Sequence, residues 1–111
     1  LHYYTFSCLF TGDIEKEVEQ HLLDTKTDLS ADLLKVAHHG SKTSSTQKFI
    51  QKINPKISVI CVGRNNSFGH PSKLTIENLE SINSKIYRTD LNGEIKISKY
   101  KYNDIKIWTM F

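Results

Sequence analysis

The sequence LLKVAHHGS occupies residues 33–41, and the fold is built around it. Its first part is a nearly continuous apolar run, which is typical of a strand buried on both faces of a sheet. The run ends in two histidines, a glycine and a serine, a polar end that is typical of a loop beside a functional site. The stretch therefore predicts a buried strand over residues 31–37 with imidazoles at its carboxyl end.

The rest of the chain alternates between strand and helix patterns. Apolar residues that recur every four positions, as in residues 14–23, predict amphipathic helices. Runs of β-branched residues, as in residues 57–62, predict strands. The predicted strands before the final hairpin span residues 2–10, 31–37, 57–62 and 85–88. Helices are predicted between them: one over 14–23, one opened by a Ser44-x-x-Gln47 capping box and one capped by Ser72. A turn over 89–93 and a hairpin that turns at Asn103-Asp104 complete the chain.

This order predicts a single α/β layered unit of 111 residues. The final hairpin is expected to join the preceding strands in a mixed sheet and to protect its edge with lysines (Lys96, Lys99, Lys101 and Lys106). Cys8 and Cys61 lie in apolar strand patterns, which predicts buried free thiols rather than a disulfide or a thiolate metal site.

The composition is that of an ordinary globular protein, with 38% apolar and 24% charged residues. No apolar run approaches the length of a membrane helix, and the start of the chain does not resemble a secretory signal. The net charge of +3 permits contact with a polyanion but does not predict it.

Candidate ligands follow three of the predicted strands. Asp13 follows the first strand, His38 and His39 follow the second, and His70 follows the third. Parallel strands end at one edge of a sheet, so these side chains are expected to lie together there. A carboxylate and several imidazoles suit zinc, manganese or iron. Taken singly, Asp13 is typical of a helix cap and His70 of a loop residue, and only the set predicts a metal site.

Four motifs in this order resemble the metallo-β-lactamase superfamily, and within it the hydrolase domain of ComEC-like competence proteins. They are a Thr-Gly-Asp at 11–13, a Lys-Val-x-His-His-Gly-Ser at 35–41, a Gly-Arg-Asn with a Gly-His-Pro within 63–71, and a Tyr-Arg-Thr-Asp-x-x-Gly at 87–93. The resemblance implies that residues 1–111 form a partial domain, the C-terminal half of an αββα sandwich.

The resemblance also implies a site with two divalent metal ions, zinc or manganese. Asp13 would bridge the metals, and one histidine of the pair would bind the second metal. We favour His38, which stands at the strand end, with His39 as the alternative. His70 would contact the substrate phosphate or take part in proton transfer. Asp13, His38 and His70 are therefore the expected catalytic residues. Ser41, Arg64 and Asn65 are candidates to hold a phosphate, and Asp90 is a candidate to hold the second nitrogen of a metal-bound imidazole.

One motif of the superfamily, His-x-(His or Asp)-x-Asp-His, does not occur in these residues. In the superfamily it lies before the Thr-Gly-Asp, so we expect it to precede Leu1. The chain would then contain at most half of the metal ligands. We therefore expect the isolated 111 residues to bind metal weakly or not at all and to be inactive.

Three functions follow from the resemblance. The first is part of a metal-dependent phosphodiesterase or nuclease that acts during DNA uptake. The second is a stand-alone hydrolase of a lactone, a thioester or a small phosphodiester. The third is a non-catalytic module for DNA contact or assembly, and the lysines of the final hairpin (Lys96, Lys99, Lys101 and Lys106) would then be its surface.

The expected partners are DNA, the remainder of the hydrolase domain and a second copy that covers an exposed apolar face. The expected location is a soluble domain of a bacterial membrane protein outside the cytoplasm, with membrane contact only through other parts of that protein. A cytoplasmic or secreted stand-alone hydrolase is the alternative.

Overall fold

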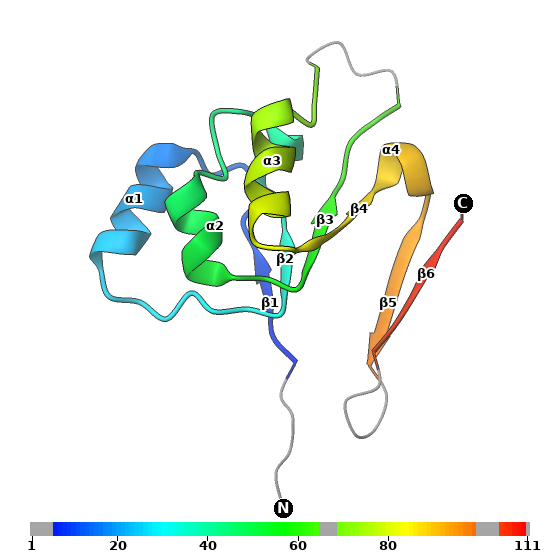
Figure 1. The fold of residues 1–111 in the computed structure, drawn as a ribbon, viewed down its shortest axis with the longest axis horizontal. Helices are drawn as coiled ribbons and strands as arrows, with labels where there is room; N and C mark the ends of the chain where they lie inside the picture. Colours follow the sequence, from blue (N-terminus) through cyan, green and yellow to red (C-terminus); the bar gives the residue numbers. More distant parts are fainter. Residues whose placement is uncertain (1–5, 65–68, 100–104, 111) are drawn as a thin grey trace, which may run out of the picture.

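The computed structural model describes residues 6–64, 69–99 and 105–110 (Figure 1). Four parallel strands form one sheet in the order β1-β2-β3-β4. Helices connect the strands in succession and lie together on one face of the sheet (Figure 1). The strands of this sheet are β1 (Cys8–Phe10), β2 (Leu33–Lys35), β3 (Ile57–Ile60) and β4 (Lys85–Arg88), and the helices are α1 (Lys16–Asp24), α2 (Gln47–Ile53) and α3 (Lys73–Ser81).

The core lies between the sheet and these helices. Leu34 of β2 and Ile60 of β3 point toward the helices and are almost fully buried. They pack in one cluster with Phe49 and Ile50 of α2 and Leu79 of α3. This cluster therefore joins β2 and β3 to α2 and α3 in one core.

The predicted strands and helices are confirmed within the described residues, with shifted ends. The strand at 85–88 matches β4, and α1 begins two residues later than the predicted helix. Ser72 caps α3 as predicted, because its hydroxyl accepts a hydrogen bond from the backbone N–H of Thr75. Residues 1–5 of the first predicted strand lie outside the described residues.

The predicted capping box at the start of α2 is wrong. The helix begins at Gln47, and the residue before it, Thr46, makes no side-chain cap. The Ser44 hydroxyl instead donates to a backbone carbonyl before α1. The carboxylate of Glu19, on α1, accepts hydrogen bonds from the backbone N–H groups of Ser45 and Thr46. A neighbouring helix therefore supplies the cap that the local sequence was expected to supply.

The prediction of one mixed sheet is also wrong for the described residues. The strands β5 (Ile95–Lys99) and β6 (Ile105–Thr109) pair with each other in a separate antiparallel sheet. Between β4 and β5 the chain forms a short helix, α4 (Thr89–Asn92), where a turn was predicted. Gly93 follows with φ of 69°, and this left-handed residue redirects the chain away from β4 (Figure 1). The predicted turn at Asn103-Asp104 lies outside the described residues.

The second face of the four-stranded sheet is not covered by a helix within the described residues (Figure 1). Phe10 is 71% exposed there, and Cys8 is exposed as well. The two cysteines are free as predicted, but neither is fully buried, because both lie on this open face. We call it the uncovered face. It forms a groove of about 390 Å³ lined by Phe6, Cys8, Phe10, Leu33, Lys35, Val59, Cys61 and Ile97.

We expect the isolated chain to self-associate through the uncovered face, because an apolar sheet face of this kind is stabilised by burial. Light scattering over a range of concentrations measures this association. Phe10→Glu should shift the chain toward the monomer, whereas Leu91→Glu, at an exposed position of α4, should not. A wild-type chain that stays monomeric at every concentration would contradict the prediction.

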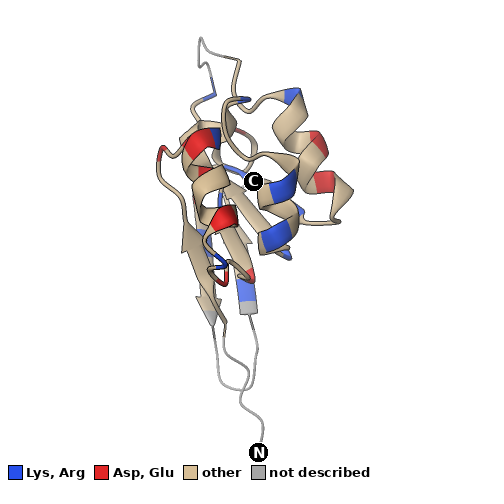
Figure 2. Ribbon diagram, turned by 90° about the vertical axis from the view of Figure 1, so that its left-hand side faces the viewer, with Lys and Arg blue, Asp and Glu red and all other residues tan. Residues whose placement is uncertain are grey.

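The surface over the helices has charges of both signs. Figure 2 shows acidic and basic residues interspersed on the helices that cover the sheet. This layer therefore differs from the basic stripe of a dedicated duplex-binding protein. Among the described residues, no helix combines the length and the apolar character needed to cross a membrane.

Candidate functional site

The loops that follow β1, β2 and β3 are neighbours at the carboxyl edge of the sheet. The backbone N–H of His38 donates to the carbonyl of Gly12 over 2.9 Å, which joins the first two loops. The backbone N–H of Ser72 donates to the carbonyl of Gly40 over 2.8 Å, which joins the second and third. The Thr-Gly-Asp turn, the histidine pair and the Gly-His-Pro loop therefore meet as predicted.

The two histidines lie in a tight turn, Ala37–Gly40, which we call the histidine turn. His38 and His39 have φ of 51° and 54°, in the left-handed region that residues other than glycine rarely adopt. Such a conformation costs about 1–3 kcal/mol per residue and persists only where the surrounding structure holds it. Gly40 continues the turn with φ of 79° and lies against Pro71.

The ring of His39 has a defined hydrogen-bond partner. Its Nδ1 lies 2.6 Å from the backbone carbonyl oxygen of Cys61, at the end of β3. A carbonyl can only accept, so Nδ1 carries a proton, and in the neutral ring Nε2 therefore keeps its lone pair. His39 is exposed, so its ring is accessible from solvent at this edge of the sheet. A metal-bound histidine has the same arrangement, with its second nitrogen held by a carbonyl or a carboxylate.

The ring of His38 has different surroundings. Its Nδ1 lies 3.5 Å from a carboxylate oxygen of Glu15, a contact too long and too poorly aligned for a hydrogen bond. Its ring meets the ring of His70 edge to face, with 6.0 Å between the ring centroids. Glu15 is not among the residues predicted for the site, although its position two residues after Asp13 places it beside the same edge.

The pKa of His70 is lowered from its ordinary value. Partial burial is the main cause, and the positive charges that His38 and His39 can acquire add to it. His70 is therefore neutral near pH 7, and a neutral imidazole can accept a proton. The structure thus places the three histidines of the prediction in one neighbourhood.

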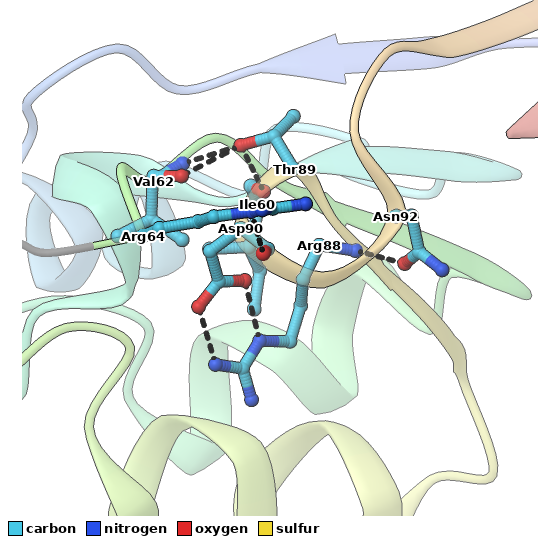
Figure 3. Close-up of polar contacts among 7 residues, drawn as sticks. All are labelled: Ile60, Val62, Arg64, Arg88, Thr89, Asp90 and Asn92. Carbon is cyan, nitrogen blue, oxygen red and sulfur yellow. Dashed lines mark hydrogen bonds and ion pairs between the residues drawn. The ribbon is translucent and has the colours of Figure 1, made fainter. Parts of the chain in front are cut away.

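Asp90 forms an ion pair with Arg88 on the neighbouring strand end. Two hydrogen bonds join them, Nε to Oδ1 over 3.0 Å and Nη2 to Oδ2 over 2.7 Å (Figure 3). Mainly through these bonds, Arg88 holds the pKa of Asp90 below its ordinary value. The stabilisation is therefore present above the ordinary carboxyl pKa and is lost as the pH falls through the lowered value. Arg64, an expected phosphate ligand, donates from Nε to the backbone carbonyl of Asp90 over 3.2 Å (Figure 3).

Thr89 positions the loop that leaves β3, a role that its motif alone does not predict. Its hydroxyl accepts a hydrogen bond from the backbone N–H of Val62 over 2.7 Å and donates to the Val62 carbonyl over 2.9 Å (Figure 3). The side chain of Asn92 accepts from the backbone N–H of Arg88 (Figure 3). The Tyr-Arg-Thr-Asp motif thus joins α4 to the end of β3, beside the carbonyl that holds His39.

Three other residues were predicted for the site: Ser41, Asp13 and Asn65. Ser41 is 5% exposed, and its hydroxyl is hydrogen-bonded to the hydroxyl of Thr43 over 2.9 Å. Asp13 is exposed in the first loop, and Asn65 lies outside the described residues. Within the parts of the chain that are described, no group of three or more His, Cys, Asp or Glu side chains is arranged to hold a metal ion.

These features define an α/β protein with a parallel sheet, a separate antiparallel hairpin, and histidines and carboxylates at the carboxyl edge of the sheet. Its homologues are competence-associated proteins. The chain is 41% identical over 98 residues to ComE operon protein 3 of Bacillus subtilis, covering 88% of this chain and 12% of that protein. It is 32% identical over 95 residues to Recombination protein 2 of Haemophilus influenzae, covering 86% of this chain and 12% of that protein.

Competence protein ComA of Neisseria gonorrhoeae is a third relative, 32% identical over 89 residues that cover 79% of this chain and 13% of that protein. The chain thus spans 12–13% of the length of these relatives. No family model matches the sequence. No solved structure gives a significant match. Membership of the metallo-β-lactamase superfamily therefore stays a prediction from the four motifs.

Proposed function

We propose that this chain is part of a DNA-uptake protein and that its carboxyl-edge loops contribute ligands to a metal-dependent phosphodiesterase. The competence-associated homologues support the biological role. The orientation of His39 supports the chemistry, because a hydrogen bond of 2.6 Å to the Cys61 carbonyl presents its Nε2 lone pair for coordination. Residues elsewhere in the full-length protein complete the ligand set.

The side-chain donors at this edge are of the kinds that bind divalent metal ions. Asp13 provides an exposed carboxylate, and the neighbouring histidine turn provides an imidazole of defined tautomer. A bound pair of metal ions would supply a hydroxide near neutral pH and would polarise the phosphate oxygens. The neutral ring of His70 can accept a proton beside His38. Arg64, held by the Asp90 carbonyl, supplies a positive charge at the same edge.

We now favour His39 as the metal ligand. The sequence had favoured His38, because His38 stands at the strand end. The Nδ1 of His38 is buried near Glu15, and its ring packs against His70. His38 is therefore better placed to position His70 and the turn, and His39 is better placed to coordinate a metal ion.

Hydrolysis of a lactone, a thioester or a small phosphodiester would use the same residues. Assays of the full-length protein on these substrates and on DNA distinguish the alternatives.

We expect zinc to bind the 111-residue chain weakly and to perturb His39 and Asp13. A titration with Zn²⁺, followed by calorimetry and by NMR signals of the histidine rings and of the Asp13 amide, measures both effects. His39→Ala should lower the zinc affinity by about tenfold or more, because the fixed imidazole is lost. His21→Ala, at an exposed position of α1, is the matched control and should leave the affinity unchanged.

Two results would contradict this interpretation. Tight stoichiometric zinc, or clear nuclease activity of the 111 residues alone, would show that the ligand set is complete without other sequence. Zinc binding that perturbs neither His39 nor Asp13 would show that the metal does not bind at the carboxyl edge.

A further inference from the structure

The hairpin of β5 and β6 has two unlike faces. Residues that face each other across the strands, Ile97 with Ile107 and Lys96 with Trp108, alternate between these faces. Ile97 lines the groove on the uncovered face of the parallel sheet. The opposite face of the hairpin therefore points away from that sheet. We call it the outer face, and its described residues are Lys96, Ser98, Lys106 and Trp108.

Trp108 is the principal apolar group of the outer face. It is 42% exposed, and the Nζ atom of Lys96 lies 5.6 Å from the centroid of its ring. Lys106 is exposed two positions before Trp108 on the same strand and face. An electron-rich aromatic ring with cations beside it is the combination that binds single-stranded nucleic acid, because bases stack and phosphates pair with lysine.

A shallow cavity adjoins the tryptophan. It has a volume of about 250 Å³ and is lined by Glu94, Lys96, Trp108, Thr109 and Met110. Met110 is 62% exposed and adds an apolar wall. The cavity thus has an aromatic surface and an apolar wall for a planar base, and Lys96 stands at its border for the phosphate that follows.

We propose that the outer face of the hairpin binds single-stranded nucleic acid, with one base stacked on Trp108 and with Lys96 and Lys106 on the flanking phosphates. The choice of DNA rests on the proposed DNA-uptake role. Binding at this surface does not involve the histidine turn or a metal ion, so it can be tested apart from hydrolysis.

Glu94 makes the proposal more specific. It lines the same cavity, where a carboxylate repels phosphate but can accept a hydrogen bond from an exocyclic amino group of a base. Thymine has no such amino group. Glu94→Gln should therefore tighten the binding of oligothymidylate, whereas Lys96→Gln should weaken it.

The test measures binding of labelled oligothymidylate by fluorescence anisotropy at several salt concentrations, with a chelator present. Trp108→Ala should raise Kd by about tenfold, and Trp108→Phe should preserve most of the affinity, because stacking needs an aromatic ring. Lys96→Gln and Lys106→Gln should each reduce the slope of log Kd against log salt by about 0.7. The matched control is Lys48→Gln, at an exposed position of α2.

Trp108 is the sole tryptophan of the chain, so its fluorescence reports on the proposed contact directly. Quenching that saturates with the anisotropy signal supports stacking. Binding without any change in tryptophan fluorescence, wild-type affinity in Trp108→Ala, or no binding at low salt would each overturn the proposal. Because the chelator removes metal ions from the assay, failure of the metal hypothesis would leave this result unchanged.

Discussion

Replacing Glu19 with alanine is expected to lower the free energy of unfolding by about 4 kcal/mol, since it removes two charge-assisted hydrogen bonds of about 1.5–3 kcal/mol each. The Glu19 side chain is 0% exposed, and its two oxygens accept from the backbone N–H groups of Ser45 and Thr46. In the alanine variant these donors would lie at the buried start of α2 without an acceptor. Urea unfolding followed by circular dichroism measures the change.

Two further variants separate the causes. Glu19→Gln keeps one acceptor oxygen in the same place, so about half of the loss should return. Glu17→Ala removes an exposed carboxylate from the same helix and should change the stability by less than about 0.5 kcal/mol. A Glu19→Ala chain that unfolds at nearly the same urea concentration as wild type would refute this role for Glu19.

Replacing Gly40 with alanine is expected to destabilise the histidine turn by about 3 kcal/mol, combining a left-handed backbone penalty with overpacking. Gly40 has φ of 79°, and an added Cβ would lie 2.6 Å from the Cβ of Pro71 and 3.0 Å from its Cα. Pro71 is rigid and belongs to the loop of His70, so neither segment can move without disturbing the other. Thermal unfolding measures the loss, and zinc titration measures its effect on the site.

Gly12→Ala is the matched control for this substitution. Gly12 also has a left-handed φ, of 55°, but a Cβ there would have no atom within 4 Å. It should therefore cost only the backbone penalty of about 1–2 kcal/mol. Equal losses of stability in the two variants would show that contact with Pro71 contributes nothing.

The local sequence was sufficient to predict the parallel strands and the loops that end them. Leu33 and Leu34 belong to an apolar run between polar segments, and such a pattern depends only on residues close together in the chain. Once three strands run parallel, their carboxyl ends must share one edge. The meeting of the three loops there followed from the order of the elements alone.

The tertiary structure decided which side chain does what at that edge. The tautomer of His39 depends on a carbonyl 22 residues away, and the start of α2 depends on a carboxylate 26 residues away. The loop after β3 depends on the hydroxyl of Thr89, 27 residues beyond Val62, and the hairpin pairs in a sheet of its own rather than with β4. Periodicity encodes which residues are buried locally, whereas hydrogen-bond partners between distant segments exist only after the chain has packed.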